Sequence, residues 1–280
     1  PYFYWLNFIL DKITKDYISR VKSSIMVNNN SGRVVFVGAG SGAPDLITVR
    51  GLKYLRAADV VIYDSLPGED LLQEISPKAR VISVGKRCGV HSVTQTEINS
   101  IISIEAQRSH LVVRLKGGDP CIFGRLGEEI EHLLSEGIPF EVVPGITAAT
   151  AAGADAGFSL TQRGKAASVT FLTGHCADGS DQNWSAHVET GATLCLYMGA
   201  KKLAEVAQKI INAGADKKMP VRLLSKISQV GATDVLTNLA DLSENKVNIE
   251  YLPTPLIAVV GVVVSQSPLS DLAGSFEESV

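Results

Sequence analysis

The feature that most constrains the fold is a regular alternation of short apolar runs with amphipathic stretches, which begins after residue 32. The apolar runs are rich in Val, Ile and Leu, and the stretches between them show helical periodicity. The clearest helix begins at Thr94, which forms a capping box with Glu97 and is followed by Ile98, Ile101 and Ile102. Strands that are apolar on both faces and separated by helices form parallel sheets covered on each side. The sequence therefore predicts an α/β fold.

The segment Val143-Pro144-Gly145 interrupts this alternation and reads as a hinge between two α/β domains, each with its own sheet. Before it we expect strands at 33–37, 60–63, 81–84, 111–115 and 140–143, with helices at 48–57, 94–107 and 125–135. After it we expect a helix at 147–157 and strands at 168–173, 193–198, 221–224, 235–238 and 256–264. The last run is long and almost purely apolar, which suits a central strand. The predicted domains are 32–143 and 144–266, preceded by an extension over 1–31 and followed by a polar tail over 267–280.

Composition narrows the classes of function. The formal net charge of −3 argues against a nucleic-acid partner bound through a broadly basic surface, but it allows a local basic cleft for an acidic small molecule. No run approaches the ~18 apolar residues of a membrane span. The cysteines and histidines lack metal-binding spacings, so we expect no metal and free, mostly buried thiols in a reducing compartment. We expect a cytoplasmic protein; an organellar location stays open because the chain begins at Pro1, without an initiator Met.

The loop Gly38–Pro44 (GAGSGAP) follows the first predicted strand and has two interpretations. It satisfies the pattern G-x-G-x-x-A, and Asp64 ends the next strand, where a dinucleotide site places an acid to bind a ribose hydroxyl. On this interpretation the protein would be a nicotinamide-dependent oxidoreductase. However, Pro44 and Asp45 interrupt the chain where that motif requires a helix. Glycines also suit any tight turn from a strand to a helix.

The most specific segment is VVRLKGGDPCIFG, residues 112–124, in which a predicted strand ends in two glycines, an acid and a proline. Gly117 and Gly118 allow the backbone to approach a ligand without an intervening Cβ. Asp119 can accept hydrogen bonds from a ribose or an amino group, and Pro120 fixes the turn. By itself the segment supports a nucleotide-like ligand beside a glycine turn, or such a turn with no ligand.

Several stretches resemble, in order, the uroporphyrinogen-III C-methyltransferases, a family of S-adenosylmethionine-dependent tetrapyrrole methylases. They are VGAGSGAPDLITVRGL, ADVVIYDSL, VGKRCGVHSVTQTEI, VVRLKGGDPCIFGRLGEE, GIPFEVVPGITAATA, LTQRGKAASVTFLTGH and LYMGAKKL, and the similarity runs over about residues 33–264. The resemblance implies two α/β domains of the tetrapyrrole methylase type, with the cofactor in the cleft between them, and a homodimer. It implies C-methylation of uroporphyrinogen III to precorrin-2 by two methyl transfers, in siroheme and cobalamin synthesis.

The resemblance also assigns roles to single residues. The implied cofactor-binding residues are Gly117, Gly118, Asp119, Ile122, Thr147, Ala148 and Met198. Asp64 would act as the general base that takes a proton from the macrocycle, and Lys86 as a proton donor or electrostatic partner; a purely structural ion pair between them is the alternative. For the carboxylates of the substrate we expect Arg125, Arg163 and Lys116, because cations are needed there and Arg binds a carboxylate through two parallel hydrogen bonds.

The chain departs from the family's pattern at positions near these motifs. They are Ser41 for a proline, Ala43 for an acid, Ser65 for an arginine, Leu126 for a glycine, Gln162 for a histidine and Ile227 for a glycine expected against the adenosine. These departures leave three alternatives to the methylation of uroporphyrinogen III. The chain could be a methylase of another precorrin, a binding protein that has lost catalysis, or the oxidoreductase considered above.

Overall fold

The computed structural model describes residues 32–64, 68–85, 93–174 and 181–265, which divide into two compact units. The first unit runs to Ala39 and resumes over Ile47–Gly145, and the second contains Gly40–Leu46 and the chain from Ile146 onward. The sequence predicts that Gly40–Leu46 belongs to the first domain, whereas the contacts of this segment group it with the second unit. The predicted extension over 1–31 and tail over 267–280 lie outside the described residues.

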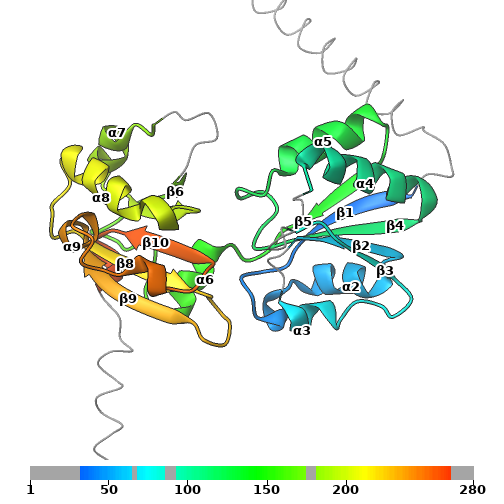
Figure 1. The fold of residues 1–280 in the computed structure, drawn as a ribbon, viewed down its shortest axis with the longest axis horizontal. Helices are drawn as coiled ribbons and strands as arrows, with labels where there is room; N and C mark the ends of the chain where they lie inside the picture. Colours follow the sequence, from blue (N-terminus) through cyan, green and yellow to red (C-terminus); the bar gives the residue numbers. More distant parts are fainter. Residues whose placement is uncertain (1–31, 65–67, 86–92, 175–180, 266–280) are drawn as a thin grey trace, which may run out of the picture. The chain divides into compact units, whose positions relative to one another are not determined.

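The first unit is built on an all-parallel sheet covered by helices on both faces. Its elements are β1 (Arg33–Gly38), α2 (Val49–Ala57), β2 (Val60–Tyr63), α3 (Glu69–Leu72), β3 (Arg80–Ser83), α4 (Gln95–Arg108), β4 (Leu111–Lys116), α5 (Leu126–Ser135) and β5 (Phe140–Val143). The strand order is β3-β2-β4-β1-β5, and every pairing is parallel. Helices α4 and α5 cover one face, and α2 and α3 cover the other (Figure 1). The predicted parallel sheet is confirmed.

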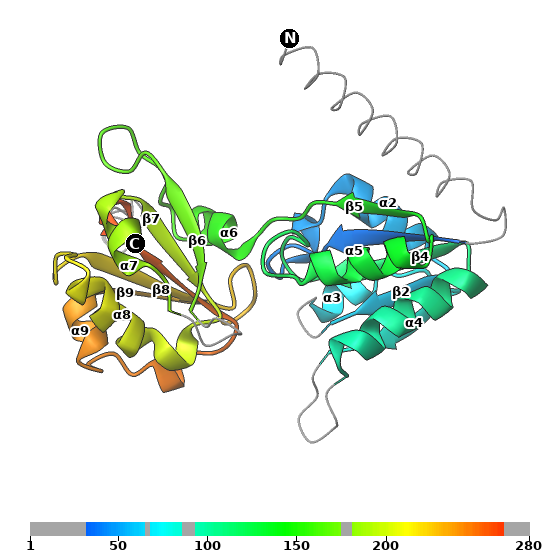
Figure 2. The ribbon, with the colours of Figure 1, turned by 90° about the horizontal axis from the view of Figure 1, so that it is seen from above.

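The apolar runs form strands because both of their faces are buried. In β1, Val34 and Phe36 pack in the cluster beneath α4 and α5, and Val35 and Val37 pack in the cluster beneath α2 and α3. Such a strand reads as a continuous apolar run, without alternation. The capping box of α4 is present as predicted: the Thr94 N–H donates to Glu97 Oε2 at 2.7 Å, and the Glu97 N–H donates to Thr94 Oγ1 at 3.2 Å. Figure 2 shows α4 and α5 running beside each other.

The second unit contains a mixed sheet. Its elements are the 3₁₀ turn η1 (Pro44–Leu46), α6 (Ala148–Asp155), β6 (Val169–Thr173), α7 (Trp184–Glu189), β7 (Thr193–Tyr197), η2 (Ala200–Lys202), α8 (Leu203–Asn212), β8 (Pro220–Ser225), β9 (Thr233–Asn238), α9 (Leu239–Ser243), η3 (Ile249–Tyr251), β10 (Leu256–Val260) and η4 (Val262–Ser265). The strand order is β6-β7-β10-β8-β9. Strands β6 and β7 are parallel, and β10 is antiparallel to both β7 and β8. The carboxyl ends of β6, β7 and β8 therefore lie at one edge of this sheet.

The predicted strand over 256–264 is central, as expected, but it is shorter. Strand β10 ends at Val260, because Gly261 adopts a φ of 156° and the chain then turns into η4. Val263 and Val264 stay buried in the cluster beneath α6. The apolar run thus reported burial correctly, but it could not show where the strand ends.

The helices of the second unit divide between the two faces of its sheet. α7, α8 and α9 contribute to the cluster on one face, and α6 contributes to the cluster on the other. Among the helices of the described residues, none has both the length and the apolar content that a membrane crossing requires.

Candidate functional site

In the first unit, the loops that follow the parallel strands leave the same edge of the sheet. The strands β1, β2, β4 and β5 end at Gly38, Tyr63, Lys116 and Val143. Open α/β sheets bind their ligands at this edge. The loop after β4 carries the GGDP motif, and Asp64 follows β2 directly.

Three glycines pack backbone against backbone at this edge. A Cβ added to Gly145 would lie 2.2 Å from the carbonyl oxygen of Gly118 and 2.8 Å from the Cα of Gly38. Gly118 also has a φ of 67°, in the left-handed region that glycine adopts without steric cost. The loops after β1, β4 and β5 therefore touch one another, with no room for a side chain at the contact.

Asp119 ties two of these loops together. Its Oδ1 accepts a hydrogen bond from the Cys121 N–H at 2.7 Å, and its Oδ2 accepts one from the Gly145 N–H at 2.9 Å. The two oxygens of a carboxylate offer about four acceptor positions, so Asp119 can still accept a hydrogen bond from a ligand. The GGDP motif, which the sequence suggested for ligand binding, therefore also has an internal role that fixes the shape of the loop.

The rest of this loop holds two non-glycine residues in the left-handed region. Phe123 has a φ of 51° and Arg125 a φ of 53°, and α5 begins directly afterwards. Such conformations cost roughly 1–3 kcal/mol each and cluster at functional sites. Ile122, a predicted cofactor contact, is half-buried in the same loop. Leu126, which replaces a family glycine, is accommodated in the buried cluster beneath α4 and α5.

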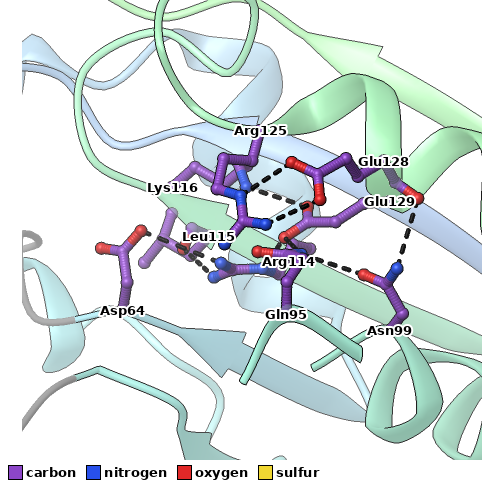
Figure 3. Close-up of polar contacts among 9 residues, drawn as sticks. All are labelled: Asp64, Gln95, Asn99, Arg114, Leu115, Lys116, Arg125, Glu128 and Glu129. Atoms are coloured by element: carbon purple, nitrogen blue, oxygen red, sulfur yellow. Dashed lines mark hydrogen bonds and ion pairs between the residues drawn. The ribbon is translucent and has the colours of Figure 1, made fainter. Parts of the chain in front are cut away.

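A buried network of charges lies behind the edge, between the sheet and α5 (Figure 3). Arg114 and Lys116 project from β4, and Glu129 projects from α5; their side chains are 4%, 4% and 0% exposed. Glu129 Oε1 accepts from Arg114 Nε at 3.3 Å, and Glu129 Oε2 accepts from Lys116 Nζ at 2.9 Å. Gln95 of α4 also donates to Glu129, at 3.2 Å. Because buried charges are costly unless paired, the three charged groups depend on one another.

The network extends toward Asp64 at the edge. The Arg114 guanidinium lies between Glu129 and Asp64, and its Nη2 is 3.9 Å from Asp64 Oδ2 (Figure 3). Arg114 Nη1 also donates a hydrogen bond to the Leu115 carbonyl, at 3.1 Å, which fixes the orientation of the guanidinium. The Asp64 side chain is 27% exposed, so it is the member of this set that meets solvent. Lys86, its predicted partner, and the departure at Ser65 lie outside the described residues.

The three predicted substrate-binding cations are placed differently. Burial first, and then the positive charge of Arg114, lower the pKa of the Lys116 ammonium. Lys116 is therefore held inside the network and is not presented to a ligand. Arg125 is exposed and forms two bonds of 2.7 Å with Glu128. Arg163 is exposed in a turn of the second unit that is closed by the backbone of Gln162 and Ala166.

In the second unit, the loop after β7 and the start of α6 come together. The Tyr197 hydroxyl lies 2.7 Å from Thr147 Oγ1 and accepts a hydrogen bond from the Ala149 N–H at 3.1 Å. Met198, the next residue, is 60% exposed and has a φ of 55°. Thr147 and Ala148 are half-buried. Three of the predicted cofactor residues thus gather around Tyr197, or adjoin it in the chain.

Sequence reasoning missed Tyr197 and Glu129. Tyr197 stands next to Met198 in the quoted stretch LYMGAKKL, but an aromatic residue at a strand end gives no signal by itself. Glu129 lies three residues after Leu126 and four before Leu133, both of which are buried. An acidic residue at a position where the helical period places an apolar residue indicates a buried charge. This pattern could have predicted that Glu129 is buried.

Two further expectations concern Ile227 and the cysteines. Ile227 is buried in the cluster that α6 forms with the sheet, so its side chain packs into the core of the second unit. Of the cysteines in the described part of the chain, Cys195 is buried and Cys121 is exposed, and both are free thiols. Within the same residues, no three His, Cys, Asp or Glu side chains gather in a group that could hold a metal ion.

The strand order contradicts the dinucleotide interpretation. In dinucleotide-binding sheets the first strand pairs directly with the second, which brings the acid beside the glycine loop. Here β4 lies between β1 and β2, so a strand separates Asp64 from the loop after β1. The 3₁₀ turn η1 and the cap of α2, where Thr48 Oγ1 accepts from the Gly51 N–H at 3.0 Å, also separate that loop from the helix. The fold instead defines a two-unit α/β protein in which each unit has its own sheet.

Comparison with known proteins identifies the family. A sequence model of the tetrapyrrole (corrin/porphyrin) methylases matches residues 33–243. The chain belongs to this family. The predicted fold class of two α/β domains of the tetrapyrrole methylase type is confirmed, since solved structures with related sequences superpose on the chain.

Individual relatives are similar over most of the chain. Siroheme synthase 1 of Yersinia enterocolitica is 46% identical over 238 residues, which are 85% of this chain and 50% of the relative. Uroporphyrin III C-methyl transferase of Thermus thermophilus, solved in its native form and with S-adenyl homocysteine, is 34% identical with a TM-score of 0.74, over 84% of this chain and 99% of the relative. A cobalt precorrin-4 methyltransferase is 29% identical with a TM-score of 0.73, over 83% and 95%. The chain spans about half the length of the siroheme synthases it matches.

Proposed function

We propose that the chain is a methyltransferase that uses S-adenosylmethionine to methylate uroporphyrinogen III, giving precorrin-2 by two methyl transfers in siroheme synthesis. The observation that carries the proposal is the loop after β4, in which Gly118 and Asp119 hold a fixed shape while Asp119 keeps lone pairs for a ligand. The relatives named siroheme synthase and uroporphyrin III C-methyl transferase support the choice of substrate.

The residues present suit S-adenosylmethionine, whose sulfonium group supplies an electrophilic methyl when it is bound. Ile122 and Met198 offer partly exposed apolar surface for the adenosyl group. Asp119 can accept hydrogen bonds from the ribose or the amino group, and Gly117 adds a backbone that no Cβ shields. Thr147 and Ala148, at the start of α6, supply a hydroxyl and a backbone N–H for the polar edge of adenine.

For the chemistry, we propose Asp64 as the general base and Lys86 as a proton donor or electrostatic partner. Asp64 stands at the sheet edge with a partly exposed carboxylate, and Arg114 lies behind it. Such a group can take the proton that the macrocycle loses once the new carbon–carbon bond has formed. Proton transfer of this kind contributes typically about 10²–10⁴-fold to a rate.

The substrate carries several carboxylates, for which we propose Arg125 and Arg163 as partners. Both guanidinium groups are exposed, and Arg binds carboxylates through two parallel bonds. To bind a substrate carboxylate, the Arg125 guanidinium would have to release Glu128, or bind Glu128 and the substrate at the same time. Lys116, predicted for the same role, stays bonded to Glu129, so we assign it an indirect effect through the charge of the network.

We further propose that the enzyme is a cytoplasmic homodimer whose domains correspond to residues 32–143 and 144–266, except that Gly40–Leu46 belongs with the second domain. The free thiols of Cys121 and Cys195 favour a reducing compartment. The dimer rests on the resemblance alone, and light scattering coupled to size-exclusion chromatography would measure its mass. Elution as a monomer across the micromolar range would contradict it.

The test is to mix the protein with S-adenosylmethionine and anaerobic uroporphyrinogen III. We expect the absorbance of a methylated, chlorin-like product and release of S-adenosylhomocysteine, quantified by mass spectrometry. Cofactor binding without turnover would indicate a binding protein, and a failure to bind S-adenosylmethionine would overturn the proposal.

The second candidate is methylation of another precorrin, which the likeness to the cobalt precorrin-4 methyltransferase favours. In the same assay, this candidate predicts that S-adenosylhomocysteine is released with a more highly methylated precorrin as acceptor and not with uroporphyrinogen III. The two acceptors should be compared at equal concentration, with the same protein preparation.

A further inference from the structure

Two serines from loops that are far apart in the sequence are in direct contact. Ser41 belongs to the glycine-rich loop Gly40–Leu46, and Ser228 belongs to the loop after β8. Their hydroxyl oxygens lie 3.0 Å apart although the residues are 187 positions apart in the sequence. Both loops are part of the second unit, so the contact lies within one compact body.

Ser228 is anchored in turn to the last residue of α6. Its backbone N–H and its hydroxyl both donate to Asp155 Oδ2, at 2.6 and 3.0 Å. An ionised carboxylate can only accept, so the Ser228 hydroxyl must give its proton to Asp155. It then accepts from Ser41, and the bonds run in one direction from Ser41 through Ser228 to Asp155.

The backbone around this chain of bonds is strained. Ser228 has a φ of 59° and Lys226 a φ of 47°, and neither residue is glycine. Conformations of this kind persist when surrounding contacts over-determine them. The two bonds to Asp155 supply that restraint at Ser228.

Gln229 adds a second link between the same loops. Its Nε2 donates to the Ser41 carbonyl at 3.2 Å. A Cβ added to Gly42, which has a φ of 151°, would lie 2.3 Å from the Gln229 Cγ. The glycine-rich loop is therefore held by a hydroxyl, by a carbonyl and by close packing on one neighbouring side chain.

We propose that Asp155, Ser228 and Ser41 form a positioning device, here called the serine relay, which holds the loops Gly40–Leu46 and Lys226–Gln229 in one conformation for the methyl donor. Where the family's pattern has a proline in the first loop, this chain restrains that loop by side-chain hydrogen bonds. The proposal rests on the proposed function, because its link to the donor is position 227, where the family's pattern has a glycine against the adenosine. A loop that is already ordered loses less entropy when its ligand binds.

Backbone hydrogen exchange of the free protein tests the relay without any ligand. Ser228→Ala should speed exchange in residues 40–46, and Ser41→Ala should speed it in residues 226–229. Ser243→Ala is the matched control in the same unit, since it removes a hydroxyl bonded only to the nearby Ala240 carbonyl. Exchange in both loops that stays unchanged in both relay variants would overturn the proposal.

Calorimetric titration with S-adenosylmethionine tests the consequence for binding. Each single variant should weaken affinity by about 3- to 10-fold, the net value of one hydrogen bond. The double variant should bind S-adenosylmethionine about as tightly as the single variant with the lower affinity, because both changes break the same relay. Ser41→Thr, which keeps the hydroxyl, should restore the affinity of the parent. Additive losses, or no loss, would count against the relay.

The two experiments separate this proposal from the one on which it rests. If the parent protein does not bind S-adenosylmethionine, the proposed function fails, while hydrogen exchange still decides whether the relay orders the loops. If the parent binds the donor and the variants bind it equally well, the relay fails as a positioning device and the proposed function stands. Thermal unfolding of each variant identifies any loss of affinity that comes from a loss of folded protein.

Discussion

The two units fix their loops by different physical means. In the first unit, glycine backbones meet with no room for a Cβ, and a buried network of full charges stands behind them. In the second, hydroxyl groups of Tyr197, Ser228 and Ser41 hold loops that include strained residues. A substitution in closely packed backbone or in a buried charge network costs much stability, whereas single neutral hydrogen bonds are worth only about 0.5–1.5 kcal/mol each. Substitutions in the loops of the first unit should therefore have large effects, and substitutions in the loops of the second unit should have small ones.

The largest effect should come from Asp64, the candidate base at the sheet edge of the first unit. In Asp64→Asn the side chain keeps its size but cannot take a proton, so methyl transfer should fall by about 10²–10⁴-fold. Affinity for S-adenosylmethionine should stay within a few fold, as measured by calorimetry. Asp70→Asn, an exposed position in α3, is the matched control and should leave turnover unchanged. A fully active Asp64→Asn variant would remove Asp64 from the mechanism.

The next effect should be on stability, through Glu129. Glu129→Leu leaves Arg114 and Lys116 buried without their carboxylate, which should lower the free energy of unfolding by about 3–5 kcal/mol. Glu74→Leu, which breaks the exposed pair with Arg56, should cost no more than about 1 kcal/mol. Urea denaturation of both variants gives the comparison. Similar losses in the two would show that the network does not behave as a buried one.

The glycine contact gives a smaller effect, with a control of opposite sign. Gly145→Ala forces a Cβ against the Gly118 carbonyl, and such overpacking should destabilise the fold by about 1–3 kcal/mol. Gly127→Ala lies in α5 with open space around its Cβ, and it should stabilise the fold by about 0.5–1 kcal/mol. Thermal unfolding distinguishes the two signs. If Gly145→Ala does not change stability, the loops of the first unit adapt to substitution as easily as those of the second unit.

The smallest effect is expected at Met198, in the loop after β7 of the second unit. Glycine would relieve the left-handed backbone there but would add entropy to the unfolded chain, so Met198→Gly should stabilise the fold by at most about 1 kcal/mol. The same change removes apolar surface from the proposed cofactor site, so affinity for S-adenosylmethionine should fall while stability does not. Affinity equal to that of the parent would remove Met198 from the site.

The sequence predicted the strands well because these follow from short-range patterns, but the helices α3, α7, α8 and α9 were not predicted. The parallel strands of the first unit and the capping box at Thr94 were both read directly. The end of β10 was missed because apolar residues continue through the turn after Gly261. Burial is visible in composition, but the path of the backbone at a glycine is not.

The site could be predicted only in part, because its contacts join residues that are distant in the sequence. Lys116 reads as a cation available to a ligand, since nothing in a strand sequence shows that a glutamate on the next helix will bind it. The contact between Ser41 and Ser228 is equally invisible, because the two serines are 187 positions apart in the sequence. The sequence shows Ser41 as a departure from the family's pattern, and only the fold shows which residue it contacts.

The buried charges also limit the order in which this site can change during evolution. Loss of either Lys116 or Arg114 first leaves one buried cation paired with Glu129, so the charge inside the network stays balanced. Loss of Glu129 first leaves two buried cations without their carboxylate. The three positions therefore do not drift independently. A descendant lineage can lose Glu129 only after, or together with, a change at one of the two cations.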